Sequence, residues 1–376
     1  MIFYIVFLLF ISSLLLMQYF CPFKQRILEI IVLGIIVLIS GLRKSVGYDY
    51  NNYVLWYLYK VRDQDFEFGF VAIMNLFRYF DLPPFFLFFF FSFFTYLFVY
   101  LGIKKYTSNS NLALLFFIMI PGLYLTSFTI LRQFFSVAIC FYSFSFLINK
   151  KYIQYFLLMF IGLSIHNSCL IPFILFLIVF RYGNQIKINY LYGIMFFSFL
   201  FSSLGFFHFF HFFFDKSRYL YYFSNQNELV NIWKIIVLNF EGILILYYFK
   251  INKYTYSYQH YLVVLYSFSI VFLNLFSNNA DLTRIAIYFR IFEIIIVSDL
   301  IFSQANNNRK ILFSFFYTLY FLSFLNALKK DLEFEDVNMS KLIPYNNILL
   351  SSSKSNTTEG YEITRYSYIW VSEFYS

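Results

Sequence analysis

Two polar residues interrupt the long apolar stretches of the segment 124–172. Arg132 lies near the start of one apolar run, and His166 lies near the end of the next, beyond a turn that contains Lys150–Lys151. An arginine at the centre of a membrane costs about 2.5–3.5 kcal/mol on insertion scales, so it is usually interfacial, paired or functional. Because one basic turn joins the two runs, we expect Arg132 and His166 to emerge on the same side of a bilayer. That side is the candidate active face.

Ionisable residues that could bind or react with a substrate fall on this same face, in loops or in the outer halves of apolar runs. They are Arg43, Asp49, Glu67, Arg132, His166, Arg284 and Arg290. Arginine presents a planar fork of donors that matches two phosphate oxygens at once, so several arginines around one cavity would suit a lipid pyrophosphate. The candidates for this binding role are Arg43, Arg132, Arg284 and Arg290.

Each arginine also has a structural interpretation. Arg43, Arg132 and Arg284 could simply extend to lipid head groups. Arg290 lies deeper in its run, and there the alternative is an ion pair with Glu293, one helical turn away.

The candidates for catalysis are His166, Glu67 and Asp49. A histidine with its ordinary pKa of about 6.5 can remove a proton at neutral pH, so His166 could act as a general base. Glu67 or Asp49 could share or replace that role. The structural alternative is a polar turn, because Asn167 and Ser168 are both good caps for the helix that follows.

The sequence predicts neither a metal nor an organic cofactor. His208, His211 and Asp215 would share one helical face, but three such ligands in an aromatic loop are a weak signal for a metal. The three cysteines show no ligand spacing and no disulfide framework, and Cys140 and Cys169 fit small buried side chains in apolar runs. No phosphate-binding loop, dinucleotide fingerprint, HExxH motif or nucleophile elbow is present.

The composition indicates a membrane protein with many spans. The chain is 61% hydrophobic and 12% charged, with a mean hydropathy of +0.69. Its aromatic content of 26% is assigned to lipid-facing and core packing, with Tyr and Trp at the interfaces. The net charge of +9 favours anionic partners, and membrane lipids or pyrophosphates fit better than nucleic acid.

Apolar runs define the predicted fold, an all-α polytopic integral membrane protein with about 11–12 transmembrane helices. They lie at about 2–20, 27–40, 83–103, 111–125, 129–148, 152–165, 168–180, 189–207, 230–249, 260–276, 284–302 and 310–327. A helix over 152–165 would rise only about 21 Å, less than a hydrocarbon core of about 30 Å. The segment 152–180 is therefore either a pair of short spans or a re-entrant hairpin broken around His166, and both return the chain to the same side.

We expect a single integral-membrane domain over 1–350, with external loops at 41–82 and 208–229. The part of the first loop at 66–80 is predicted to form a short helix on the membrane surface, with Glu67 at its start. Residues 351–376 form a polar tail that we expect to be poorly ordered.

Basic residues orient the predicted spans, because alternate short loops contain Lys and Arg but no acidic residue. These residues are Lys24 and Arg26, Lys104 and Lys105, Lys150 and Lys151, Arg181 and Lys187, Lys250 and Lys253, and Arg309 and Lys310. The positive-inside rule places these loops in the cytoplasm, so the N-terminus, the opposite loops and the tail are expected outside.

Several short motifs, in this order and spacing, resemble the EpsG-type branch of the Wzy-like bacterial polysaccharide polymerases. They are GLRKSVGYDYNNY, FEFGF, ILRQFFSVAI, a KKY turn, GLSIHNSCLI, RIAIYFR and a late IPY. That family typically shows an R-x-x-x-G-x-D-x-x-x-Y loop, a Glu-bearing segment, an R-Q start to a span, an H-x-S-like break and a late Pro-Tyr. The resemblance covers about 35–350. Tyr48 stands where Thr is more usual and FEFGF replaces a Glu-Pro pair, but neither difference removes a candidate group.

The resemblance implies a GT-C-like, Wzy-like architecture and a glycosyltransferase that polymerises undecaprenyl-pyrophosphate-linked oligosaccharide repeats. It would act on the outer face of the bacterial cytoplasmic membrane and build O-antigen, capsule or exopolysaccharide, alongside a chain-length regulator and a flippase. Lipid pyrophosphate is a good leaving group, so no cofactor is required. The positions that match the family pattern are Arg43, Asp49, Glu67, Arg132, His166 and Arg284.

Two other functions remain open. A lipid-linked oligosaccharide flippase should place charged groups at mid-depth along a path open to both sides, and the gathering of charges on one predicted face favours an enzyme instead. A ligase that moves finished glycan to another acceptor, or an acetyl-type transferase, would need the same arginines and base, so the sequence does not separate these from a polymerase.

Overall fold

The computed structural model describes residues 1–17, 25–60, 65–203, 232–251, 258–277, 279–334 and 341–349. Within these ranges the fold is helical, as predicted, and contains no strand beyond an isolated bridge between Arg43 and Asn347. The loop 208–229, with its histidines, and the tail 351–376 lie outside the described residues.

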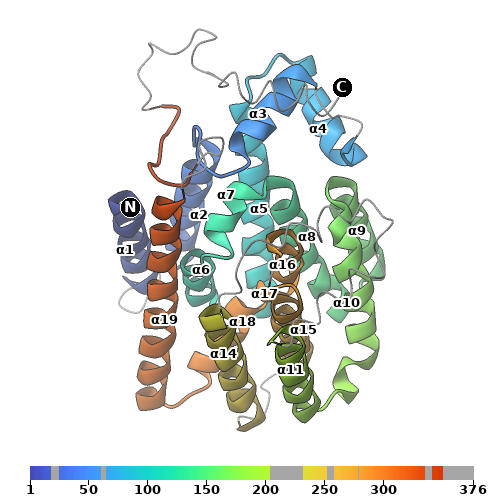
Figure 1. The fold of residues 1–376 in the computed structure, drawn as a ribbon, viewed down its shortest axis with the longest axis vertical. Helices are drawn as coiled ribbons and strands as arrows, with labels where there is room; N and C mark the ends of the chain where they lie inside the picture. The colour runs from blue at the N-terminus through green and yellow to red at the C-terminus, as the bar shows by residue number, and fades with distance from the viewer. Residues whose placement is uncertain are drawn as a thin grey trace.

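Within the described residues, helices occupy the predicted apolar runs, and two further helices form in the predicted loop 41–82 (Figure 1). The first group is α1 (Ile2–Leu16), α2 (Gln25–Gly41), α3 (Tyr50–Tyr59), α4 (Phe68–Tyr79), α5 (Phe85–Tyr106), α6 (Ser110–Met119), α7 (Tyr124–Thr129), α8 (Leu131–Ile148) and α9 (Tyr152–Ile165). The second group is η4 (Asn167–Cys169), α10 (Leu170–Tyr182), η5 (Gly183–Gln185), α11 (Ile188–Ser203), α14 (Ile232–Ile251), α15 (Tyr258–Leu275), α16 (Ala280–Thr283), η6 (Arg284–Ala286), α17 (Ile287–Arg290), α18 (Glu293–Phe302) and α19 (Asn306–Glu333).

The lengths and compositions of these helices define a multi-pass membrane protein. Five helical segments are long and apolar enough to cross a membrane. They are Phe85–Tyr106, Leu131–Ile148, Asn167–Gln185, Tyr258–Leu275 and Asn306–Glu333. Several other apolar helices are shorter than about 18 residues, and two spans are broken, between α6 and α7 and between α16 and α18.

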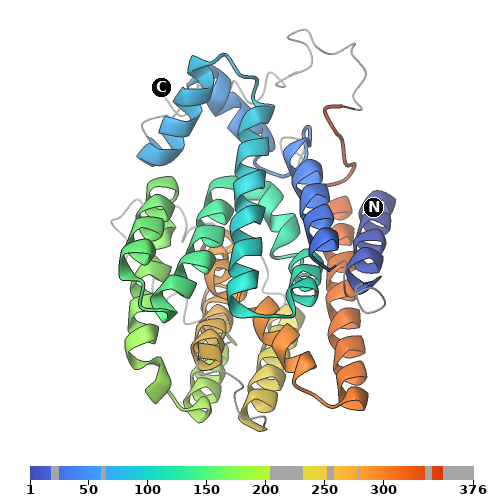
Figure 2. The same ribbon diagram turned by 180° about the vertical axis from the view of Figure 1, so that it is seen from behind.

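The predicted break within 152–180 is confirmed. Helix α9 ends at Ile165, His166 has extended backbone (φ −155°, ψ 121°), and the short 3₁₀ turn η4 leads into α10. The short helix predicted over 66–80 is also present, as α4, with Glu67 as its N-cap residue. Together with α3, α4 lies across one end of the bundle (Figures 1 and 2).

Helix α8 lies in the interior of this bundle. It packs between α5 and α9, and 78% of its span is buried inside the protein. It begins beside α4 and runs through 18 residues to the Lys150–Lys151 turn, so Arg132 lies about 25 Å from these lysines. The candidate active face and the basic turn are therefore at opposite ends of α8.

A strap formed by residues 341–349 covers the loop between α2 and α3. Asp331, at the end of α19, accepts the backbone N–H groups of Leu342 (3.0 Å) and Ile343 (2.9 Å) and the hydroxyl of Tyr48 (2.9 Å). Backbone bonds complete the strap: Lys44 N–H to Asn346 O, Gly47 N–H to Lys341 O and Ile348 N–H to Leu42 O. The late IPY motif thus holds the loop that contains Asp49.

Candidate functional site

The structure brings together five of the seven residues singled out in the sequence. Each lies where a helix begins, ends or breaks: Asp49 before α3, Glu67 before α4, Arg132 in the first turn of α8, His166 between α9 and η4, and Arg284 at the start of η6. Asp49 and His166 both interact electrostatically with Arg132 and Arg284. Because the charged residues lie at helix ends and breaks, the apolar helices can span the hydrocarbon while these residues gather at one end of the bundle.

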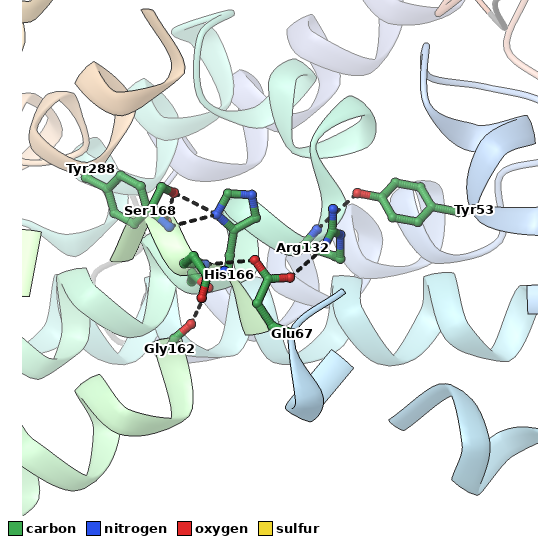
Figure 3. A network of polar contacts seen from close by, with 9 residues as sticks. Tyr53, Glu67, Arg132, Gly162, His166, Ser168 and Tyr288 are labelled. Carbon is green, nitrogen blue, oxygen red and sulfur yellow. Dashed lines mark hydrogen bonds and ion pairs between the residues drawn. The ribbon is translucent and has the colours of Figure 1, made fainter. Parts of the chain in front are cut away.

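Glu67 joins three elements of the site (Figure 3). Its Oε2 lies 2.6 Å from Nη1 of Arg132, and its Oε1 accepts the backbone N–H of Asn167 at 2.9 Å. The two charged side chains are only 10% and 16% exposed, so this ion pair is largely shielded from water. Glu67 therefore ties α4 to α8 and to the break that holds His166.

A glycine makes this contact between α4 and α9 possible. A Cβ atom on Gly69 would lie 2.4 Å from Oγ and 2.7 Å from the carbonyl oxygen of Ser164. Without a side chain, α4 packs directly against the last turn of α9, next to His166. The FEFGF motif thus supplies both the carboxylate and the close approach that positions it.

Arg132 keeps one donor unused. Its guanidinium carbon lies 4.4 Å from the ring centroid of Phe66 and 5.1 Å from that of Phe70. Its backbone N–H donates to the hydroxyl of Tyr53 at 3.5 Å. The side-chain Nε is buried and has no hydrogen-bond partner among the described residues. An arginine with one carboxylate and a free donor can still bind an anion.

Ser168 and Tyr288 surround the Nδ1 side of His166 (Figure 3). Its Nδ1 accepts the backbone N–H of Ser168 at 3.3 Å and lies 2.7 Å from Oγ of Ser168, which in turn lies 2.9 Å from the hydroxyl of Tyr288. A backbone N–H can only donate, so Nδ1 is unprotonated and the neutral ring has its hydrogen on Nε2. The turn is therefore capped by the histidine ring, and the expectation that Asn167 and Ser168 cap it is wrong.

Burial and charge weaken His166 as a base. Burial, and then the positive charges of Arg132 and Arg284, lower the pKa of His166 to about 3. The ring is therefore neutral at physiological pH, and its Nε2–H is suited to donate a hydrogen bond. A group with so low a pKa gives little driving force for proton removal at neutral pH.

Asp49 has the opposite perturbation. Burial raises the pKa of Asp49; Arg284 opposes this effect, Asp281 adds to it and Arg132 opposes it. Arg284 is itself paired with Asp281 at 3.2 Å, in a contact that is 37% and 43% exposed. Asp49 is thus a carboxylate of raised basicity held beside two arginines.

Arg43 lies apart from this cluster. It is fully buried, donates to the carbonyl oxygens of Val46 (3.1 Å), Phe128 (3.1 Å) and Ser40, and lies against the ring of Phe88. Its hydrogen bonds are to the chain itself, so it stabilises the α2–α3 loop. We do not include it in the proposed binding site.

Arg290 also lies apart. Its Nε is 3.2 Å from Oε2 of Glu293, which confirms the predicted ion pair. Glu241 of α14 is buried nearby and interacts electrostatically with both residues. These groups are inside the bundle, so the expectation that the charged residues gather on one face is wrong, and that argument against a transporter no longer holds.

Sequence reasoning named Ser168 only as a helix cap, whereas it contacts His166, and it missed Tyr288, which contacts Ser168, and Asp281, which pairs with Arg284. Tyr288 lies one turn after Arg284 in the RIAIYFR motif, and Asp281 lies three residues before it. That spacing was the available signal. Within the described ranges, no three His, Cys, Asp or Glu side chains are arranged to hold a metal ion.

The fold and the site define a multi-pass helical membrane protein with an arginine–carboxylate cluster at one end of its bundle. Residues 26–347 match the sequence profile of the EpsG family. The chain belongs to this family, which is linked to exopolysaccharide biosynthesis, and the match includes every residue of the cluster. No curated protein and no solved structure matches the chain significantly.

Proposed function

We propose that the protein is a membrane glycosyltransferase that polymerises undecaprenyl-pyrophosphate-linked oligosaccharide repeats on the outer face of the bacterial cytoplasmic membrane. The observation that carries this proposal is the grouping of Arg132 and Arg284 with Asp49 at the end of the bundle opposite the basic turn. A lipid-linked donor would place its pyrophosphate at this level while its polyprenyl chain stays among the apolar helices. The positive-inside rule assigns this end to the outside.

The two arginines would bind the pyrophosphate. Arg132 is 16% exposed and has one donor, the buried Nε, that is unpaired among the described residues, and the side chain of Arg284 is 37% exposed. Charge-assisted hydrogen bonds from guanidinium to phosphate are roughly twice as strong as neutral ones. Because negative charge grows on the pyrophosphate as it leaves, these contacts strengthen in the transition state and accelerate the reaction.

Asp49 is the proposed general base. The acceptor sugar hydroxyl attacks the anomeric carbon of the donor glycan, the bond from that carbon to the pyrophosphate oxygen breaks, and the hydroxyl proton passes to Asp49. The raised pKa of Asp49 favours this transfer. His166, with its hydrogen on Nε2, is assigned to donate a hydrogen bond to a sugar or phosphate oxygen. Glu67 is a positioning residue that holds Arg132.

A strain that lacks the gene tests the proposal. The strain is complemented with wild type, Arg132→Ala, Asp49→Asn or the control Arg181→Ala, whose arginine is exposed in the last turn of α10. We expect wild type and the control to restore a ladder of surface glycan, while the two site variants leave a single repeat on its acceptor. A full ladder from Arg132→Ala would refute the assignment of the site.

The second candidate is a lipid-linked oligosaccharide flippase. The buried Arg290, Glu293 and Glu241 favour it, because transporters place charged groups at mid-depth. The same experiment separates the two functions. Loss of even the single repeat, with lipid-linked repeats retained inside the cell, would identify a flippase and contradict the polymerase. Under the polymerase proposal, a separate flippase delivers the substrate, a chain-length regulator limits the product, and membrane lipids surround the protein.

A further inference from the structure

A second charged cluster lies inside the bundle, away from the proposed active site. It contains Glu241 on α14, Arg290 at the end of α17 and Glu293 at the start of α18. Glu241 is 3% exposed and Glu293 is fully buried. Helix α14 packs against α18 (Figures 1 and 2), and the helical path between α17 and α18 is interrupted at Ile291 and Phe292.

Two carboxylates lie near one guanidinium in this cluster, and only one of them is paired with it. Glu293 Oε2 lies 3.2 Å from Nε of Arg290, and Glu241 interacts electrostatically with both. The other ionisable groups that face them are phenols, Tyr266 from α15 and Tyr320 from α19. The helices α6 and α11 contain no charged residue. With both carboxylates ionised the cluster would have a net charge of −1, which is costly in a low-dielectric interior.

The cluster also has unsatisfied acceptors. Oε1 of Glu241, Oε1 of Glu293 and the hydroxyl of Tyr320 are buried without a hydrogen-bond partner among the described residues. Tyr320 is 2% exposed and lies close to both carboxylates, although it is not in hydrogen-bond geometry with either. Buried polar atoms of this kind are rarely left unpaired, so they indicate a missing positive ligand or donor.

We infer that Glu241 and Glu293 bind one proton between them, which makes the cluster an intramembrane proton-binding site. A protonated carboxyl group of one glutamate donates to the carboxylate of the other, so a single proton satisfies one Oε1 atom on each residue. It also brings the total charge to zero, because the remaining carboxylate balances Arg290. A neutral donor could satisfy an Oε1 atom, but it would leave the net charge of the cluster at −1.

The position of the proton-binding site indicates which helices would be affected by loss of the proton. If the proton left, both carboxylates would compete for Arg290, which is bonded to only one of them here. Nη1 of Arg290 lies 3.1 Å from the position of a Cβ on Gly122, in the break between α6 and α7. Loss of the proton would therefore act on α14 and on two interrupted spans at once.

Infrared spectroscopy of the full-length protein in lipid nanodiscs tests the inference. We expect wild type at neutral pH to show the carbonyl stretch of a protonated carboxylic acid, which shifts in heavy water and is absent from Glu241→Gln. Glu293→Gln is a second variant that should also lack the band. Removal of either carboxylate leaves one carboxylate paired with one arginine, so no proton is needed to balance the charge. The control Glu333→Gln, whose carboxylate is 62% exposed, should retain the band. A band that persists at full strength in both cluster variants would overturn the inference.

The pH dependence of unfolding gives an independent measurement. A proton held by the folded state but not by the unfolded state makes the unfolding equilibrium constant rise up to tenfold per pH unit as the pH increases. We expect this slope in wild type and its loss in Glu241→Gln. Stabilisation of wild type by Na⁺, but not by an equal concentration of choline, would contradict the inference and identify a metal cation as the ligand.

Discussion

The ion pair between Glu67 and Arg132 is the contact on which the geometry of the proposed active site depends. We consider its removal by Glu67→Gln, by Arg132→Met and by both changes together. The glutamine of Glu67→Gln can still accept the N–H of Asn167. These substitutions therefore remove mainly the charge interaction between residues 67 and 132. The coupling energy of this double-mutant cycle isolates the contribution of the pair from other effects of each substitution.

The expected coupling follows from distance and burial. Exposed ion pairs contribute about 0.2–1 kcal/mol, whereas removing one partner of a fully buried pair costs about 3–5 kcal/mol. At 2.6 Å, with side chains 10% and 16% exposed, the Glu67–Arg132 pair lies closer to the buried limit. We therefore expect a coupling of about 2–3 kcal/mol in the free energy of unfolding.

Steric trapping of the protein in bicelles can measure this energy under equilibrium conditions. The matched control is the pair Lys329–Glu333 on α19, which is 3.6 Å apart and 71% and 62% exposed. Its coupling should stay below about 0.5 kcal/mol. If the Glu67–Arg132 coupling were no larger than that of the control, the pair would not hold the site together and our account of Glu67 would be refuted.

Three further results are expected. Asp49→Asn should reduce polymer formation by about 10²–10⁴-fold, as loss of a general base does. The control Glu333→Gln should leave the ladder of surface glycan unchanged. Equal ladders from the two variants would exclude Asp49 as the base. Because the pKa of His166 is about 3 when folded and 6.5 as a free side chain, the unfolded chain binds a proton first as the pH falls. Wild type should therefore lose up to about 1.4 kcal/mol of stability per pH unit between these values, and an equally steep loss in His166→Gln would disprove this origin. Gly47→Ala should destabilise the protein by more than about 2 kcal/mol in thermal unfolding, because Gly47 has φ +100° and a Cβ atom there would lie 2.4 Å from the carbonyl oxygen of Phe128. The control is Gly34→Ala, on α2, where a Cβ atom would meet no other atom within 4 Å. This control variant should be neutral or stabilising.

The helices were predictable because each apolar run is bounded by charged residues, turns or polar loops. The break at His166 was also predictable, since 152–165 is too short to span a membrane. The breaks beside Gly122 and at Ile291 also have local signals in the sequence, because Pro121 precedes Gly122 and the charged Arg290 and Glu293 flank Ile291, although the predicted apolar runs 111–125 and 284–302 include both positions. Pro121 has no backbone N–H and cannot continue α6, whereas Ile291 and Phe292 keep right-handed helical backbone angles, so the interruption there is slight.

The site was partly predictable for a similar reason. Asp49, Glu67, Arg132, His166 and Arg284 stand out because charge in or beside an apolar run is costly. The sequence could not show that Arg43 hydrogen-bonds to its own loop, because sequence alone does not distinguish a buried structural arginine from one that binds a ligand. The tautomer of His166 likewise depends on Ser168, whose backbone direction exists only in the folded turn.

The strap formed by residues 341–349 has a consequence for the order in which the protein matures. Tyr4 in the first helix donates to the carbonyl oxygen of Leu342, and Tyr345 donates to that of Ile39. The loop that leads to Asp49 emerges early from the ribosome, yet the segment that fastens it is made some 300 residues later. The nascent protein can therefore be inserted in the membrane before this loop is secured, and the position of Asp49 is fixed only after residues 341–349 have been synthesised.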